Sequence, residues 1–180
     1  DKHFELLNLC DDLSVPFFTS VFSVEDAELL YEVQTERVKI ASFESRNKEL
    51  LSYCDNNFDT IYISTGTSTV DEIKESLKYI KTSNVVLLHC VSSYPLEYAN
   101  ANLPRINSLK KLCDRVGYSD HTSGIEGSKV ALEYDIEVIE KHFTTDKRLP
   151  GRDNKFSILP HELRELSDYI KLRREMNVNH

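Results

Sequence analysis

Short apolar runs recur along the chain, and each of them ends in small or polar residues. They lie at residues 15–20, 38–42, 60–66, 85–90, 115–121 and 136–144. Apolar runs of this length predict buried β-strands. Their ends lie about 20–30 residues apart, which is the length of one strand-plus-helix unit. The pattern therefore predicts an α/β protein with a parallel sheet.

Amphipathic segments fill the gaps between these runs. Ser23 with Asp26, and Thr69 with Glu72, have the spacing of helix-capping pairs. Pro160 suits the first turn of a final helix. Helices are expected at residues 24–34, 70–81, 124–134 and 161–176. Strands that alternate with helices in this way imply right-handed crossovers between parallel strands.

Two architectures fit this alternation, an open doubly wound sheet and a (β/α)8 barrel. An open sheet concentrates its chemistry at one switch point, whereas polar groups from many strand ends converge only in a ring. Nearly every expected strand ends in such groups: Ser20, Lys39, Ser42, Glu44, Ser64, Thr65, His89, Ser92, Ser119, Asp120, His121, His142 and Thr144. We therefore favour a TIM-type (β/α)8 barrel. About six of its eight units are expected in residues 1–180, with the first two missing.

Composition narrows the choice of partners. The chain of 180 residues has a net charge of −8, with 22 Lys and Arg against 30 Asp and Glu. This acidic balance, without a basic cluster, argues against nucleic acid as a partner. No apolar run approaches the roughly 18 residues of a membrane span, so we expect no membrane partner.

Four cysteines without CxxC spacing predict free, mostly buried thiols in a reducing cytoplasm. Met176 is the only methionine, which predicts that the chain lacks its own beginning.

Lys39 lies inside an apolar run and has two interpretations. It is either a lysine whose stem packs at a strand end or the charge of an anion site. Ser42 and the segment 64–66, STG, can add hydroxyl and amide groups to such a site. Glu44 follows, and its carboxylate can bind a sugar hydroxyl or act as a base.

His89, His121 and His142 each close an expected strand. One such histidine is most simply structural, but two or three on one rim can share a divalent cation. A site with so few protein ligands leaves positions for water and substrate, as in a Lewis-acid site. In the segment 149–157, Gly151 permits a turn, and Asp153 can reach back over the barrel mouth. The alternative is an ordinary loop.

Six stretches, KIASFE, ISTG, LLHCVSSYP, GYSDHT, EKHFT and LPGRDNKFS, follow one another between about residues 15 and 170. Because it contains these stretches in this order, the chain resembles the sialic acid synthase family. Its members are the nonulosonate synthases, which condense phosphoenolpyruvate with an N-acetylmannosamine-type sugar. The resemblance implies a (β/α)8 barrel followed by a small antifreeze-like domain that reaches across a homodimer. It also implies a cytoplasmic transferase that forms a C–C bond. On this resemblance, the family's first strands and the antifreeze-like domain are expected to be missing from this chain.

The resemblance also implies roles for individual residues. A divalent metal, Mn²⁺ or Mg²⁺, would be held by His121 and His142. The phosphate and carboxylate of phosphoenolpyruvate would be bound by Lys39, Ser42, Ser64, Ser92 and Ser119. The amino sugar would face Glu44, Tyr94 and Asp153, and Glu44 or Asp153 would handle a proton or the attacking water. His89 matches no metal position and is expected to be structural. Arg152 stands where many members of the family carry proline.

Alternatives remain at this point. The product could be legionaminic or pseudaminic acid, or the chain could be a non-catalytic homologue that binds sugar or phosphate. Barrels that make 3-deoxy sugar acids often use a cysteine ligand, and Cys90 alone lies near a strand end. Asp120 could orient His121 or cap a helix that begins near Ser123. Six of eight strands leave two open edges, so the chain alone is expected to be marginally stable and poorly active.

Overall fold

The computed structural model describes residues 2–177. The chain forms two compact units, residues 1–88 with 109–115, and residues 89–108 with 116–180. The elements of the first unit are α1 (Lys2–Asp12), β1 (Ser20–Val21), α2 (Val24–Val33), β2 (Arg37–Ile40), α3 (Lys48–Asn57), β3 (Thr60–Ser64), α4 (Val70–Ser76) and β4 (Asn84–His89). Those of the second are α5 (Arg105–Leu109), β5 (Val116–Asp120), α6 (Glu126–Ala131), β6 (Ile139–Lys141) and α7 (Pro160–Met176). The last residues of β4 and α5 each belong to the other unit.

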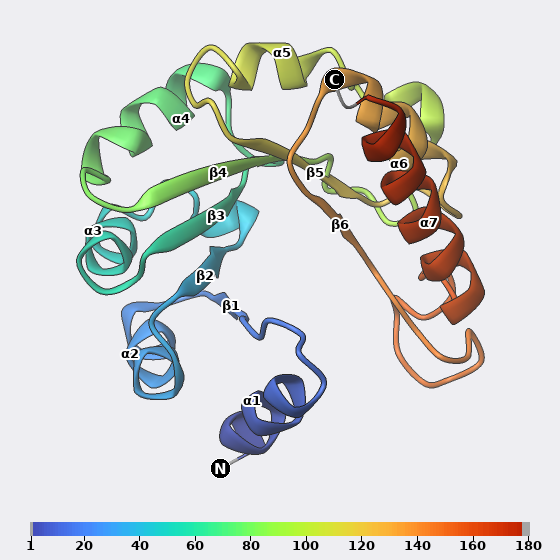
Figure 1. Cartoon of the computed structure of the whole chain (residues 1–180). Coiled ribbons are helices and arrows are strands. Elements are labelled where there is room, and N and C mark those ends of the chain that lie inside the picture. The colour runs from blue at the N-terminus through green and yellow to red at the C-terminus, as the bar shows by residue number, and fades with distance from the viewer. Residues whose placement is uncertain (1, 178–180) are drawn as a thin grey trace. The chain divides into compact units, whose positions relative to one another are not determined.

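The strands of the first unit are parallel and neighbour one another in chain order. Lys39 of β2 pairs with Ser20 of β1 and Tyr62 of β3, and Tyr62 pairs in turn with Val86 of β4. Figure 1 shows α2, α3 and α4 beside these strands. The core between helices and strands contains Val38, Ile40, Leu50, Leu51, Ile61, Ile63, Ile73, Val86 and Leu87. A strand order that never reverses is the order of a β/α barrel and not of a doubly wound sheet.

The second unit pairs β5 with β6, also in parallel. Tyr118, Ser119 and Asp120 face Ile139, Glu140 and Lys141 in the register. Helices α6 and α7 lie side by side (Figure 1), joined by an ion pair of 2.8 Å between Lys129 Nζ and Glu165 Oε1. Ile125, Ile158 and Leu166 form the apolar cluster between α7 and the strand side of this unit. The predicted α/β class with parallel strands is therefore confirmed, and the closed eight-unit barrel stays a prediction.

Two strands are shorter than the apolar runs that predicted them. The prediction over residues 15–20 was wrong except at Ser20, because pairing with β2 begins only where Lys39 N donates to Thr19 O at 3.1 Å. Pro16 has no N–H to offer, and Val15 and Phe18 are exposed. The run over residues 136–144 forms a strand only at β6, where it has partners in β5.

Two helices end earlier than predicted. The segment 70–81 stops being α-helical after Ser76, continuing as a 3-10 turn over Leu77–Tyr79. The carboxylate of Asp55 accepts the backbone N–H groups of residues 81, 82 and 83 at 2.9, 2.9 and 2.8 Å, and these bonds draw the chain out of the helix. Likewise α6 passes into a 3-10 turn, and Asp135 ends it with a φ of 50°.

The predicted caps are confirmed. Ser23 accepts from Asp26 N at 3.1 Å, and Thr69 and Glu72 form a reciprocal capping box at α4. Pro160 occupies the first turn of α7, as expected. Helices α1, α3 and α5 were not specified from the sequence. Asn47 begins α3 by accepting from Leu50 N at 3.2 Å, a cap signal present in the sequence.

The four cysteines are free thiols, as predicted, although only Cys54 and Cys90 are fully buried. None of the helices described between residues 2 and 177 has the length and apolar character that a membrane crossing requires.

Candidate functional site

The register of β5 and β6 brings two histidines together. Asp120 and Lys141 are the last residues of these strands and face each other, so His121 and His142 follow at the same end of the pair. Their ring centroids are 5.6 Å apart. The predicted pairing of these two imidazoles at neighbouring strand ends is therefore present in the second unit.

His121 is held in one orientation by the backbone. Its Nδ1 lies 2.7 Å from the carbonyl oxygen of Val91, which can only accept a hydrogen bond. Nδ1 therefore carries the proton, and Nε2 presents a lone pair 3.2 Å from Ser119 Oγ. Burial lowers the pKa of His121, and the nearby His142 ring lowers it further, which favours the neutral imidazole that a metal ion requires.

Two aromatic rings wall this histidine pair. Tyr94 lies 4.2 Å from His121 and 5.7 Å from His142, measured between ring centroids, and Phe156 lies 5.3 Å from His142. Tyr94 is half exposed, so it presents an open ring face to anything bound beside the histidines. The expectation that Tyr94 faces an amino sugar stays a prediction.

Asp153 reaches the same place from the loop over residues 145–157. Its Oδ2 lies 3.7 Å from Nδ1 of His142. The loop is closed at its base, because Ile158 N donates to His142 O at 2.8 Å and Thr144 N donates to Ile158 O at 3.0 Å. The carboxylate is 56% exposed, which leaves it free to meet solvent or a bound molecule.

A second polar set lies at the strand ends of the first unit. The register puts Lys39 opposite Tyr62, and Ser64 follows two residues later on the same face of the sheet. The Ser64 hydroxyl is buried and has no hydrogen-bond partner among the described residues. A buried hydroxyl without a partner is costly, so it marks a place where a bound group can supply one.

The neighbouring loops of this unit are tied to each other. Ser42 Oγ accepts a hydrogen bond from Gly66 N at 3.1 Å, and Thr65 Oγ1 donates to Leu88 O at 2.9 Å. These two groups of the STG segment, expected to face an anion, therefore make structural bonds instead. Glu44 accepts from Asn47 Nδ2 at 3.0 Å on a short 3-10 turn.

The predicted residues thus fall into two sets, one in each unit. Lys39, Ser42, Glu44 and Ser64 lie in the first unit, and Ser92, Tyr94, Ser119, His121, His142 and Asp153 in the second. Ser92 is exposed on the segment that also carries Tyr94.

The histidine pair can be tested as a metal site by its donors. Among residues 2–177, no three His, Cys, Asp or Glu side chains stand close enough to form a complete metal cluster. The two imidazoles, one with Nε2 already oriented as an acceptor, nevertheless fit a cation that takes its other ligands from water or substrate.

His89 lies elsewhere in the same unit. It is fully buried, its Nε2 lies 2.8 Å from Ala101 O, and its ring stacks on Tyr118 at 5.6 Å. Burial lowers its pKa, so the ring is held neutral. These contacts support the structural role expected for His89.

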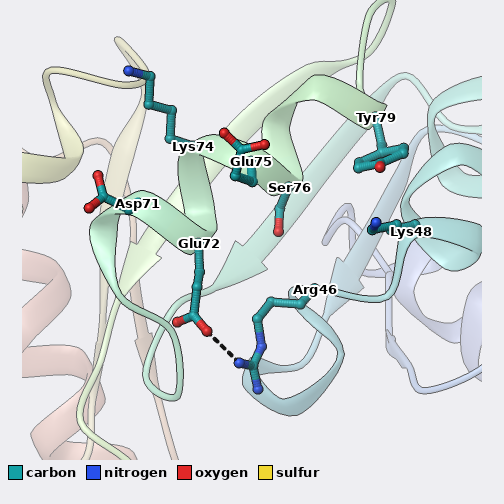
Figure 2. Close-up of a pocket in the computed structure, with 8 residues that line it drawn as sticks. All are labelled: Arg46, Lys48, Asp71, Glu72, Lys74, Glu75, Ser76 and Tyr79. Carbon is teal, nitrogen blue, oxygen red and sulfur yellow. Dashed lines mark hydrogen bonds and ion pairs between the residues drawn. The ribbon is translucent and has the colours of Figure 1, made fainter.

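A hollow in the first unit lies among charged side chains of α3 and α4 (Figure 2). Its walls are Arg46, Lys48, Asp71, Glu72, Lys74, Glu75, Ser76 and Tyr79. Arg46 pairs with Glu72 at 2.6 Å, and the Lys48 ammonium lies over the Tyr79 ring at 5.4 Å. The hollow contains none of the predicted site residues, and its charges are of both signs.

Comparison with known proteins decides the family. The model of the NeuB family matches residues 1–179. The chain belongs to the NeuB family. Relatives include the N,N'-diacetyllegionaminic acid synthase of Campylobacter jejuni, 37% identical over 175 residues, which cover 94% of this chain and 52% of that protein. The N-acetylneuraminate-9-phosphate synthase of Drosophila melanogaster is 31% identical over 175 residues, 94% of this chain and 47% of that protein.

A solved NeuB-family structure agrees in fold. The N-acetylneuraminic acid synthetase of Leptospira borgpetersenii, crystallised with citrate, superimposes with a TM-score of 0.89 at 34% identity. The match covers 98% of this chain and 64% of that one. This chain spans about half the length of the two curated relatives above. The predicted resemblance is confirmed at the level of the family.

One feature of this NeuB-family chain was missed from the sequence. Lys141 Nζ lies 2.9 Å from Asp120 Oδ2, and their side chains are 5% and 0% exposed. Asp120 does not bond to the ring of His121, which bonds to Val91, and α6 begins only at Glu126; the carboxylate instead binds Thr122, Ser128 and Lys141. The sequence did contain a signal, because Lys141 stands directly before His142 at the end of an expected strand. It did not show that Asp120 is the partner of Lys141, because this depends on the pairing register of β5 and β6.

Proposed function

We propose that this chain provides the reaction centre of a synthase that joins phosphoenolpyruvate to an amino-sugar aldehyde. With water, the products would be a sialic acid-type nonulosonate and phosphate. One observation carries the proposal: His121 and His142 meet at adjacent strand ends with Ser119 at His121 Nε2, in a chain of the NeuB family. Relatives named as legionaminic acid and N-acetylneuraminate-9-phosphate synthases support this reaction class.

The histidines would hold the metal of the reaction, proposed as Mn²⁺. His121 would bind through Nε2, because Val91 occupies Nδ1, and His142 would supply the second nitrogen. When bound there, a cation would polarise the aldehyde carbonyl and stabilise the negative charge on its oxygen, an effect of several kcal/mol in typical cases. Ser119, no longer needed by Nε2, could then donate its hydroxyl proton to an oxygen of phosphoenolpyruvate.

Lys39 and Ser64 would bind the anionic groups of phosphoenolpyruvate. The net charge of −8 repels such a substrate at long range, so a local cation is required. The Ser64 hydroxyl is buried without a partner among the described residues, and it can donate to a phosphate or carboxylate oxygen. Ser42 would serve chiefly by joining its own loop to Gly66, and the exposed Ser92 would contact substrate directly.

The bond changes follow from the two substrates. C3 of phosphoenolpyruvate attacks the aldehyde carbon and forms the new C–C bond. C2 of phosphoenolpyruvate then takes up the oxygen of water, and phosphate leaves when the bond between C2 and the phosphate oxygen breaks. The proton lost by that water needs a base, and Glu44 and Asp153 are the two carboxylates proposed for it. Holding two substrates in register can contribute roughly 7–11 kcal/mol to the rate, and the ring of Tyr94 would form the wall against which the sugar lies.

Phosphate release tests the proposal. Purified chain, supplied with Mn²⁺ and phosphoenolpyruvate, is assayed with N-acetylmannosamine, its 6-phosphate and the diacetamido hexoses that correspond to legionaminic and pseudaminic acid. Release that requires one of these sugars supports the synthase and identifies its substrate. His121→Ala and His142→Ala should each lower kcat/KM by roughly 100-fold or more. His161→Ala, in the first turn of α7, is the matched control and should leave activity unchanged.

The alternatives give different results in the same assay. A homologue that only binds sugar or phosphate would release no phosphate with any sugar of the panel, in this chain or in a longer protein that contains it. A synthase of 3-deoxy sugar acids would respond to a phosphorylated aldose without an acetamido group. We propose turnover in the longer protein as a cytoplasmic homodimer and only slow turnover in the isolated chain, so both are assayed.

A further inference from the structure

The buried ion pair between Asp120 and Lys141 lies directly beside the histidine pair. The two residues are partners in the β5–β6 register, and each immediately precedes one of the histidines. Because side chains alternate along a strand, the ion pair and the histidines extend from opposite faces. The ion pair therefore cannot be a ligand of anything held between the two imidazoles.

Lys141 joins both sides of His121. Its ammonium pairs with the Asp120 carboxylate at 2.9 Å and also donates to the carbonyl oxygen of Thr122. Residues 120 and 122 flank His121, and Lys141 itself is bonded in sequence to His142. A rotation or slip of either strand end would therefore break a buried charged contact before it could separate the histidines.

Asp120 is saturated by partners from two directions. Oδ1 accepts from Thr122 N at 2.8 Å and from Thr122 Oγ1 at 2.7 Å. Oδ2 accepts from Ser128 Oγ of α6 at 2.6 Å, in addition to the contact with Lys141. The network thus ties the ends of β5 and β6 to the helix that follows β5.

The approach of α6 depends on a glycine. A Cβ at Gly127 would stand 2.5 Å from Thr122 Oγ1 and 3.3 Å from Asp120 Oδ1. Ser128 can reach the carboxylate only because position 127 has no side chain. The packing of α6 is therefore fitted to the Asp120 network and not merely adjacent to it.

Stability alone does not explain such a pair. Removing two charges from water costs several kcal/mol per ion, and apolar residues of similar size are often as stabilising. An ion pair fixes the direction of its two side chains and the pairing register of the strands that carry them, which apolar contacts do not.

We propose that Asp120 and Lys141 are positioning residues that set the spacing and orientation of His121 and His142 for a bound divalent cation. This inference rests on the proposed function, because it takes the histidine pair to be the metal site. It adds that the geometry of that site is controlled from the opposite face of β5 and β6.

The test measures metal affinity and ring geometry separately, in the full chain. Asp120→Asn combined with Lys141→Met removes both charges and nearly keeps both volumes. We expect this double variant to fold, shown by circular dichroism and thermal unfolding, and to bind Mn²⁺ at least about tenfold more weakly in a titration followed by electron paramagnetic resonance. Without metal, the nuclear Overhauser contacts between the two imidazole rings should weaken or disappear.

The matched control is a second lysine–carboxylate pair of this unit, Lys129 with Glu165, which are 2.8 Å apart against 2.9 Å for Lys141 and Asp120. Lys129→Met with Glu165→Gln should change neither Mn²⁺ affinity nor the ring contacts. If the double variant at 120 and 141 fails to fold, Asp120→Asn alone, which keeps an acceptor for Thr122, replaces it. A folded variant with wild-type Mn²⁺ affinity and unchanged ring contacts would overturn the proposal.

If the proposed function is wrong, the same experiments give a different set of results. Mn²⁺ binding that is absent from the wild type, or that survives His121→Ala, would show that the histidines are not the metal site. The ring contacts would then still report on positioning, since they are measured without metal. Rings that stay in place in the double variant refute the positioning role whatever the metal result.

Discussion

The carbonyl oxygen of Val91 lies 2.7 Å from Nδ1 of His121 and thereby selects which ring nitrogen is available for chemistry. We predict that His121 is the Nδ1–H tautomer in the folded chain. Nitrogen-15 correlation spectra of the imidazole should show a protonated Nδ1 and an unprotonated Nε2, with the Nε2 signal broadened when paramagnetic Mn²⁺ is added. A protonated Nε2 in the neutral ring would contradict this prediction and remove the lone pair that the proposed site requires.

Ser64 should show a trade between stability and binding. Its buried hydroxyl lacks a partner among the described residues, so Ser64→Ala should leave the free energy of unfolding unchanged or raise it by up to about 1 kcal/mol. The same change should weaken phosphoenolpyruvate binding by roughly tenfold, measured by calorimetry, because a hydrogen bond to a charged group is lost.

A nearby serine provides the contrast. Ser45 Oγ is bonded to Ser42 O and Ser68 Oγ, each at 2.8 Å, so Ser45→Ala should lower stability by about 1 kcal/mol. If Ser64→Ala were as destabilising as Ser45→Ala, its hydroxyl would have a partner within the protein, and the case for a substrate contact would fall.

Asp55 should make the first unit sensitive to acid. Burial raises its pKa, but hydrogen bonds from the backbone N–H groups of Ser83, Lys81 and Thr82 outweigh burial and bring the pKa to about 2. A carboxyl group whose folded pKa lies below its unfolded value contributes stability above the unfolded pKa and loses it as the pH falls through the folded pKa. The loss should therefore occur between about pH 4 and pH 2 and amount to about 2 kcal/mol.

Urea unfolding at several pH values measures this contribution. Asp55→Asn should cost about 2 kcal/mol at pH 7 and flatten the decline in stability below pH 4. Asp59→Asn, at an exposed carboxyl on the same side of the unit, serves as the control and should change stability by a few tenths of a kcal/mol. Equal effects of the two substitutions would show that the backbone bonds of Asp55 are not responsible.

Gly127 should resist a change that ordinarily stabilises helices. Alanine has a helix propensity about 1 kcal/mol better than glycine, yet its Cβ would stand 2.5 Å from Thr122 Oγ1. We expect Gly127→Ala to lower the free energy of unfolding by about 1–3 kcal/mol. Adding Thr122→Ala should recover part of this loss, because the clashing atoms are removed, and a double-mutant cycle measures the coupling. Strict additivity would mean that the two side chains do not meet.

Much of the fold followed from local patterns. The apolar runs at residues 38–42, 60–66 and 85–90 predicted β2, β3 and β4, because strands covered on both faces are continuously apolar. The Thr69 and Glu72 box predicted the start of α4, since its two bonds lie within four residues. The end of α4 was not predictable in this way, because it depends on Asp55, which lies far away in the sequence.

In the candidate site, too, some features could be predicted from the sequence and others could not. The meeting of His121 and His142 could be predicted, because parallel strands end at one edge of their sheet. The bond from His121 to Val91 and the pair of Asp120 with Lys141 could not, because each depends on the register or on a loop conformation. Lys141 resembled Lys39 in the sequence, since both are lysines in an apolar run, and only the three-dimensional arrangement shows that Lys141 is paired with Asp120.

The loop over residues 145–157 leaves and rejoins the protein at a single point, where Ile158 N donates to His142 O and Thr144 N donates to Ile158 O. Inside it, the side-chain amide of Asn154 holds the turn by donating to Leu149 O and Pro150 O. A loop anchored only at its base can change in length or sequence without disturbing the rest of the fold, since lengthening a closed loop costs little free energy. Insertions or deletions between residues 145 and 157 should therefore change the surface around Arg152 while His121 and His142 keep their spacing.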